Sequence, residues 1–124
     1  MPLKGKVILT VDDEEDIREI LMDELKSVGA TVVGAENGSM AMECLRKDTF
    51  DAVISDVKMP VGDGIWLMNE INKEFKIKPK LFLFTGSHDG GVEEMKKLGV
   101  IEIFLKPFNL DHMIDAVSDA LKNP

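Results

Sequence analysis

The sequence predicts an α/β fold in which a parallel sheet of five strands is covered by helices on both faces. Short segments rich in Val, Ile, Leu and Phe alternate along the chain with segments of helical periodicity, and this alternation favours a parallel sheet. Most of the apolar segments are hydrophobic at successive residues, which is typical of strands that are buried on both faces. The predicted strands are residues 6–11, 31–35, 51–55, 80–84 and 100–105.

Five helices are predicted from apolar residues whose spacing places them on one helical face. Gly29 and Gly99 are stop signals for the first and fourth helices, Asn37-Gly38-Ser39 opens the second, and Asn109 is a candidate N-cap of the fifth. Trp66 lies on the third helix, where it is expected to be partly exposed and to pack against its neighbours. The apolar positions are Ile17, Ile20, Leu21, Leu25 and Val28; Ala41, Cys44 and Leu45; Ile65, Leu67, Met68 and Ile71; Val92, Met95 and Leu98; and Leu110, Met113, Ile114, Val117 and Leu121.

The composition indicates one soluble domain, residues 1–124, with a single hydrophobic core. Apolar residues make up 44% and charged residues 31% of the chain, which is the balance of a globular protein. The net charge of −8 disfavours nucleic acid as a partner, because phosphate backbones attract clustered Lys and Arg. No apolar run is long enough to cross a membrane, and residues 1–6 do not resemble a secretory signal. The single cysteine, Cys44, excludes an internal disulfide, so a cytoplasmic protein without membrane contact is expected.

Polar side chains stand at the carboxyl ends of the predicted strands. In parallel sheets these ends meet at one edge, and functional sites form there. The second strand offers no reactive group, as expected for a strand at the edge of the sheet. The other four ends carry Asp12 and Asp13 after the first strand, Asp56 after the third, Thr85 after the fourth, and Lys106 with Pro107 after the fifth.

This combination of side chains predicts a site for a phosphoryl group. Three converging carboxylates repel one another, and a hard divalent cation relieves the repulsion because carboxylate oxygens are its preferred ligands. The cation and the Lys106 ammonium would neutralise the phosphoryl oxygens, Thr85 would donate a hydrogen bond, and a carboxylate would serve as nucleophile. Each residue alone has a simpler explanation, such as helix capping for the acidic pair or turn formation for Thr85. Their coincidence at four strand ends favours the functional interpretation.

Four segments resemble the receiver domain of two-component response regulators, and the resemblance spans nearly the whole chain. They are VDDEEDIRE (11–19), FDAVISDVKMPVGDG (50–64), the Thr85-Gly86 step and LKPF (105–108). The chain is therefore identified as a single receiver domain. The resemblance implies a flavodoxin-like (βα)5 three-layer sandwich with strand order 2-1-3-4-5. Chemotaxis receivers are themselves standard examples of that order, which comes from the family and not from these residues.

The resemblance further implies that Asp56 accepts a phosphoryl group from a histidine kinase or a histidine phosphotransfer protein. Mg²⁺, for which Mn²⁺ can substitute, would be bound directly by Asp13, Asp56 and the backbone carbonyl of Lys58, with Asp12 acting through a bound water. Such a domain takes part in its own phosphorylation and dephosphorylation and is not a conventional turnover enzyme. A monomer or a weak dimer is expected.

Phosphorylation of a receiver domain is expected to shift a partner-binding face. Lys106 would pair with the phosphoryl oxygens, and its peptide bond to Pro107 is expected to be cis. Thr85 would bind the phosphoryl group and alter the following loop, the fourth helix, the fifth strand and the fifth helix. The family usually carries Tyr or Phe three residues before the lysine, where this chain has Ile103. The neighbouring Phe104 is expected to point to the opposite face of the strand, so the usual aromatic switch is absent.

Three further positions depart from the family pattern. Lys58 lies two residues after Asp56, where its cation either affects the phosphoryl group or is simply solvated. Gly62 replaces a larger apolar residue, and Gly90-Gly91 precedes the fourth helix, which predicts looser switching segments. Ser87-His88 is expected to form an exposed part of the loop after the fourth strand.

Other classes of protein share parts of this pattern. A haloacid-dehalogenase-type phosphatase also uses an aspartate nucleophile, Thr, Lys and Mg²⁺, but it needs a second aspartate where this chain has Lys58. A flavodoxin-type flavin binder needs a phosphate-cradling loop where this chain has Asp12-Asp13-Glu14-Glu15, which would repel a phosphate. Because Ile103 replaces the usual aromatic residue, a second interpretation is kept: the chain has the receiver fold but binds its partners constitutively and no longer switches. The sequence also does not distinguish between three organisations of the protein: a single-domain regulator, a phosphorelay shuttle, and a receiver excised from a longer protein.

Overall fold

The computed structural model, which describes residues 1–86, 92–107 and 109–122, contains one five-stranded parallel sheet. The strands are β1 (Val7–Val11), β2 (Thr31–Ala35), β3 (Ala52–Asp56), β4 (Lys80–Thr85) and β5 (Val100–Leu105). The helices are α1 (Glu15–Ser27), α2 (Gly38–Lys47), α3 (Gly64–Glu74), α4 (Val92–Lys96) and α5 (Leu110–Lys122). The strand order is β2-β1-β3-β4-β5 and every neighbouring pair is parallel, so the expected fold class and strand order are confirmed.

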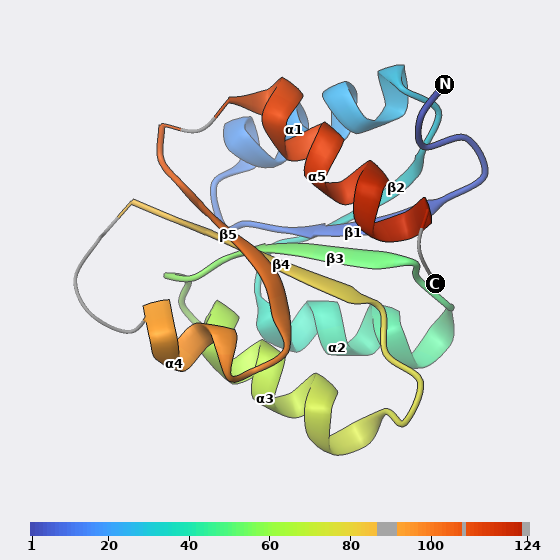
Figure 1. The fold of residues 1–124 in the computed structure, drawn as a ribbon. Coiled ribbons are helices and arrows are strands. Elements are labelled where there is room, and N and C mark those ends of the chain that lie inside the picture. Colours follow the sequence, from blue (N-terminus) through green and yellow to red (C-terminus); the bar gives the residue numbers. More distant parts are fainter. Residues whose placement is uncertain (87–91, 108, 123–124) are drawn as a thin grey trace.

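The sheet separates two layers of helices (Figure 1). Helices α1 and α5 cover one face, and α2, α3 and α4 cover the other. Successive strand residues therefore enter different cores: Ile8 packs with the side chains of α1 and α5, whereas Leu9 packs with those of α2 and α3. Since both faces are covered, the strands are apolar at successive residues, which is why the hydrophobic runs located them within one residue of each end.

The helix starts follow from capping side chains. The Oδ1 atom of Asn37 accepts a hydrogen bond from the backbone N–H of Met40 at 2.8 Å. Likewise, Oδ1 of Asn109 accepts one from the backbone N–H of His112 at 3.1 Å. Each bond satisfies a donor that the first turn leaves free, so both predicted helix starts are confirmed.

Two helical positions differ from the predicted apolar faces. Ile20 was expected on the buried face of α1, but 54% of it is exposed, and it lines an open apolar groove together with Ile17 and Leu110. Cys44 is half-buried and packs at the margin of the core formed with α2 and α3. The pattern of spacing identified the helices correctly but could not show where a helix face passes the edge of the sheet.

The N-terminal segment before β1 contributes to the core, which the sequence pattern did not indicate. Leu3 is fully buried among the side chains of α1 and α5. Its backbone N–H donates to the carbonyl of Val28 at 3.0 Å, and the hydroxyl of Ser118 donates to the carbonyl of Pro2 at 3.5 Å. The segment is therefore attached to the C-terminal end of α1 and to α5.

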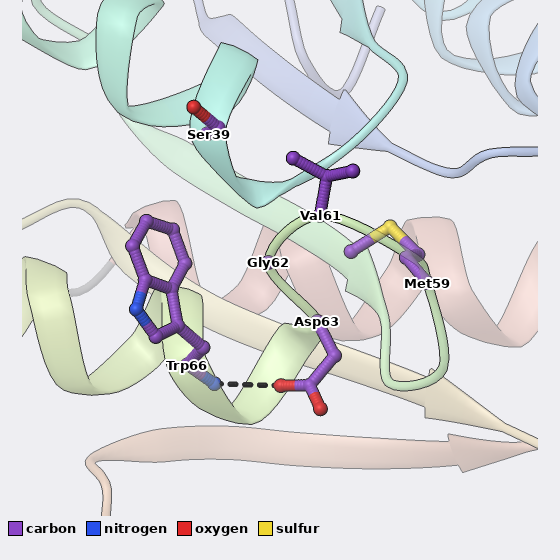
Figure 2. Close-up of a pocket in the computed structure, with 6 residues that line it drawn as sticks. All are labelled: Ser39, Met59, Val61, Gly62, Asp63 and Trp66. Carbon is purple, nitrogen blue, oxygen red and sulfur yellow. Dashed lines mark hydrogen bonds between the residues drawn. The ribbon is translucent and has the colours of Figure 1, made fainter.

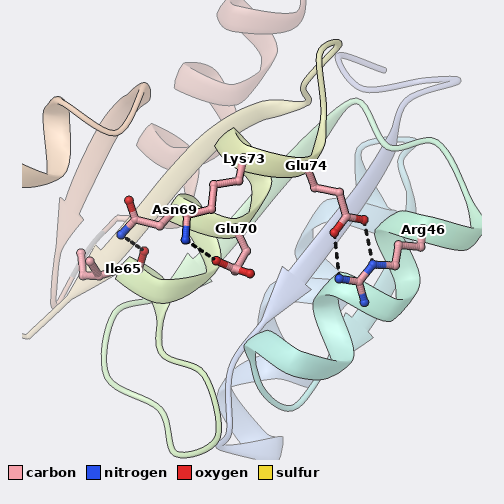
Figure 3. Close-up of polar contacts among 6 residues, drawn as sticks. All are labelled: Arg46, Ile65, Asn69, Glu70, Lys73 and Glu74. Carbon is pink, nitrogen blue, oxygen red and sulfur yellow. Dashed lines mark hydrogen bonds and ion pairs between the residues drawn. The ribbon is translucent and has the colours of Figure 1, made fainter.

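Helices α2 and α3 are joined at their C-terminal ends by a bidentate ion pair (Figure 3). The Nε and Nη2 atoms of Arg46 donate to the two carboxylate oxygens of Glu74 at 2.7 and 2.8 Å. The hydrogen bond from Arg46 lowers the pKa of Glu74. Both side chains are exposed, so the pair contributes little to the stability of the fold. Within the described residues, no helix is long and apolar enough to cross a membrane.

Candidate functional site

Three aspartates meet at the carboxyl ends of β1 and β3. Asp12 and Asp13 directly follow β1, and Asp56 is the last residue of β3, its neighbour in the sheet. One carboxylate oxygen from each residue lies within 4.8 Å of the others. Asp12 and Asp56 are buried, at 0% and 6% exposure, whereas Asp13 is exposed. The predicted convergence of the three carboxylates is therefore observed.

The two side-chain oxygens of Asp12 differ in their surroundings. Oδ1 accepts a hydrogen bond from the backbone N–H of Glu14 at 2.9 Å, whereas the buried Oδ2 has no partner among the described residues. Burial raises the pKa of Asp12 from 3.8 to about 6, despite the lowering effect of the Glu14 N–H, and the charges of Asp56 and Asp13 add to the rise. A buried anionic oxygen without a hydrogen-bond donor is energetically unfavourable, and a cation bound beside it would stabilise its charge.

Lys106 reaches the acidic cluster from the end of β5. Its Nζ atom lies 3.3 Å from Oδ2 of Asp56 and 5.2 Å from the centre of the Phe84 ring. The backbone N–H of Lys106 donates to the carbonyl of Thr85 at 2.8 Å, and the Lys106–Pro107 peptide bond is cis. Thr85 is buried and is the last residue of β4, one position beyond Phe84, which pairs with Asp56 in the sheet. All four predicted strand ends therefore contribute residues to one rim.

The comparisons with known proteins agree with this geometry. A family model described as the response regulator receiver domain matches residues 8–118. The chain belongs to this family. The chemotaxis protein CheY of Halobacterium salinarum is 36% identical over 120 residues, which cover 94% of this receiver domain and 98% of CheY.

Longer relatives match the receiver domain over only part of their own length. The transcriptional regulator NtrC of Escherichia coli K12 is 28% identical over 94% of this chain, but the match covers 25% of NtrC. The Regulator of RpoS from the same organism is 36% identical over 86% of this chain, and the match covers 32% of it. The chain thus spans a quarter to a third of these relatives.

A solved structure also resembles the receiver domain. The response regulator protein TrrA from Thermotoga maritima, in complex with Mg²⁺ and BeF, is 34% identical, with a TM-score of 0.83 over 94% of this chain and 98% of TrrA. Receiver domains bind Mg²⁺ at an acidic pocket, and the aspartate cluster fits such an ion. Carboxylate oxygens are the ligands that Mg²⁺ prefers. A bound cation would also compensate the buried Oδ2 of Asp12, which has no partner among the described residues.

The loop from β3 to α3 packs against Trp66 in this receiver domain (Figure 2), and the looser segment expected from Gly62 stays a prediction. The ring of Trp66 lies against the backbone of Gly62, where a Cβ atom would come within 2.9 Å of Cε3. The φ angle of Gly62 is 93°, and its carbonyl accepts a hydrogen bond from the N–H of Gly38 at 2.8 Å. Glycine thus allows the loop to lie between α2 and Trp66, and Trp66 keeps 41% exposure as expected.

The other positions that depart from the family pattern are confirmed, untested or outside the described residues. Ile103 packs with the core on the α2 and α3 face, whereas Phe104 stacks on Phe82 in the opposite core with ring centres 6.0 Å apart. The expectation that Phe104 points to the opposite face of the strand from residue 103 is therefore confirmed. Lys58 is exposed, and its role as a ligand through the carbonyl stays a prediction. Ser87-His88, Gly90-Gly91 and Phe108 lie outside the described residues.

One residue next to the site was missed by the sequence reasoning. The Nη1 atom of Arg18 donates to the backbone carbonyl of Asp12 at 2.8 Å, from the second turn of α1. Arg18 lies inside the segment VDDEEDIRE, but its spacing from Asp12 carries no signal of this contact. An arginine on a helix surface is ordinarily solvated, so only the position of α1 on the sheet reveals the hydrogen bond.

Proposed function

We propose that this receiver domain accepts a phosphoryl group on Asp56 from a phosphorylated histidine of a kinase or phosphotransfer protein. The observation that carries the proposal is the position of the buried Asp56 carboxylate between the other two aspartates and Lys106. Asp13, Asp56 and the carbonyl of Lys58 would hold Mg²⁺, with Asp12 acting through a water molecule. When bound, the ion supplies positive charge to the phosphoryl oxygens.

The transfer exchanges one bond to phosphorus for another. An oxygen of Asp56 attacks the phosphorus atom while the bond from phosphorus to the histidine nitrogen breaks, and that nitrogen keeps the electron pair. Lys106, already 3.3 Å from Asp56, would move its ammonium onto a phosphoryl oxygen and neutralise part of the added charge. Thr85 would donate its hydroxyl hydrogen to another phosphoryl oxygen. The product is an acyl phosphate on Asp56, and water later hydrolyses it.

Turnover of an external substrate is not part of the proposal. A phosphatase of the haloacid-dehalogenase type would need an acid two residues after its nucleophile, and Lys58 occupies that position with an exposed side chain. The domain would instead change its own state and bind protein partners in the cytoplasm, as a monomer or weak dimer. Asp56 would thus be a reactant that is regenerated when the phosphoryl group leaves it.

Two surfaces next to the site are proposed to bind protein partners. An apolar groove beside Lys106 is lined by Ile17, Ile20 and Leu110, and it would receive the phosphate donor. The second surface is formed by α4, β5 and α5, where Ile101 is 47% exposed. This second surface would change when Asp56 is phosphorylated and would bind the downstream protein.

Incubation with acetyl phosphate and Mg²⁺ is expected to add the mass of one phosphoryl group to the intact chain. Asp56→Asn should abolish the gain because an amide is not a nucleophile, whereas Asp51→Asn, at the opposite end of β3, should keep it. Intact-mass spectrometry with and without EDTA measures the result. A wild-type chain that binds Mg²⁺ but gains no mass would overturn the proposal.

Addition of beryllofluoride and Mg²⁺ to the wild-type chain is expected to shift amide resonances of β4, α4 and β5. The mimic occupies the phosphoryl position, and the backbone of Lys106 is bonded to Thr85, so a change at the site reaches both strands. Resonances of Thr31 and Val32, at the start of β2 and away from the strand ends that carry the site, serve as the internal control. Shifts confined to residues that touch the aspartates would favour constitutive partner binding over switching.

A further inference from the structure

Asp12 is held by partners on three sides. Its backbone N–H donates to the carbonyl of Ala35 at 3.1 Å, its carbonyl accepts from Arg18 at 2.8 Å, and its Oδ1 accepts from the N–H of Glu14 at 2.9 Å. Oδ2 is the remaining polar atom, and it is the one without a partner among the described residues. The hydrogen bonds therefore fix the direction in which Oδ2 points.

The contact with Arg18 acts on the peptide unit between Asp12 and Asp13. A peptide unit is planar, so the carbonyl of Asp12 and the N–H of Asp13 turn together. With the carbonyl held by Arg18, the chain must leave β1 in one orientation, and this orientation sets where the Asp13 side chain begins. Without the bond, the carbonyl could rotate and carry Asp13 away from Asp56.

The side chain of Arg18 is itself held in place by β2. Its stem lies on Gly34, where a Cβ atom would come within 3.1 Å of Cδ of Arg18 and 2.8 Å of Sδ of Met22. Arg18 is half-buried and, within the part of the chain that the structure describes, forms no ion pair with a carboxylate. Its guanidinium therefore orients the acidic loop through a carbonyl and leaves the carboxylates available to a cation.

We propose that Arg18 is a positioning residue for cation binding, which holds the Asp12–Asp13 peptide so that both carboxylates face Asp56. This inference rests on the Mg²⁺ site of the proposed function. It makes a prediction of definite sign, because removal of a positive charge near three carboxylates should strengthen cation binding by electrostatics alone. A positioning role requires the opposite result.

Arg18→Met keeps an apolar stem over Gly34 and removes the hydrogen-bond donors. It is expected to raise the Kd for Mg²⁺ about tenfold, which is typical for the loss of a residue that orients metal ligands. Arg18→Lys keeps the charge but not the planar fork, so its Kd should lie between the two. Lys26→Met removes the same charge from an exposed position further along α1, and its Kd should stay equal to or below that of the wild type.

Isothermal titration calorimetry of the intact chain with Mg²⁺ alone measures each Kd, and urea unfolding in EDTA shows that the variants are folded. If Arg18→Met does not fold, Arg18→Lys provides the comparison. Equal or tighter Mg²⁺ binding in the folded Arg18 variants would overturn the positioning role and leave the proposed function standing. A wild-type chain that binds no Mg²⁺ would overturn both.

Discussion

Asp12→Asn is expected to raise the free energy of unfolding of the metal-free protein by about 3 kcal/mol at pH 8. The carboxylate of Asp12 is buried and its Oδ2 has no partner among the described residues, so the folded state holds an unfavourable charge. Asparagine keeps an oxygen that can accept from Glu14 and offers an N–H to the neighbouring carboxylates. The variant thus removes the charge and keeps the local hydrogen bond.

The gain should depend on pH in a defined direction. The pKa of Asp12 is raised from 3.8 to about 6 in the folded protein, so the folded state binds this proton more tightly than the unfolded chain does. The wild type therefore loses stability as the pH rises through this interval, and the loss is complete above it. At pH 4 the wild type and Asp12→Asn should differ by less than about 1 kcal/mol.

Urea unfolding in EDTA at pH 4 and pH 8 measures the difference. Asp13→Asn is the matched control, since Asp13 is exposed and its replacement should give a smaller gain. Saturating Mg²⁺ should narrow the gap between wild type and Asp12→Asn, because ion binding stabilises the folded wild type. Equal stabilities of the two proteins at pH 8 in EDTA would contradict the burial of an unpaired charge.

Leu3→Ala is expected to lower the free energy of unfolding by about 3 kcal/mol. Leu3 is fully buried among the side chains of α1 and α5, and its truncation leaves a cavity that the surrounding helices cannot fill completely. Leu3 lies before residues 8–118, the segment that the family model matches. The prediction therefore tests a part of the core that lies outside the matched segment.

The midpoint of urea unfolding, at an unchanged m-value, measures the effect. Ile77→Ala provides the comparison, because Ile77 is 94% exposed and its truncation should leave the midpoint unchanged. If Leu3→Ala also leaves the midpoint unchanged, the segment before β1 does not pack on the domain in solution.

Much of the fold could be predicted from local features of the sequence. The strands are short apolar runs because both faces of the sheet are covered, and the helix starts at Asn37 and Asn109 use side chains that cap their own first turns. These interactions join residues that are close in the sequence, so their signals are visible in it. The convergence of strand ends then followed from the parallel order of the sheet.

Contacts between distant segments could not be predicted in this way. The packing of Trp66 on Gly62 and Gly38 depends on how the loop after β3 meets the start of α2. The exposure of Ile20 depends on where α1 passes the rim of the domain. Glycine and isoleucine are compatible with several such environments, so composition and spacing do not distinguish them.

The two aspartates after β1 separate what residue order predicts from what depends on folding. The amino-acid order alone places five polar residues at strand ends, and their chemistry suits a phosphoryl group and a cation: Asp12, Asp13, Asp56, Thr85 and Lys106. Residue type and spacing could not distinguish Asp12 from Asp13, which are identical and adjacent, and only the resemblance to receiver domains assigned them different roles. The structure buries Asp12 completely, fixes it with Ala35, Glu14 and Arg18, and leaves Asp13 exposed. Burial and hydrogen bonding are set by β2 and α1, which the sequence does not place around either residue, and these two factors decide which carboxylate needs the cation most.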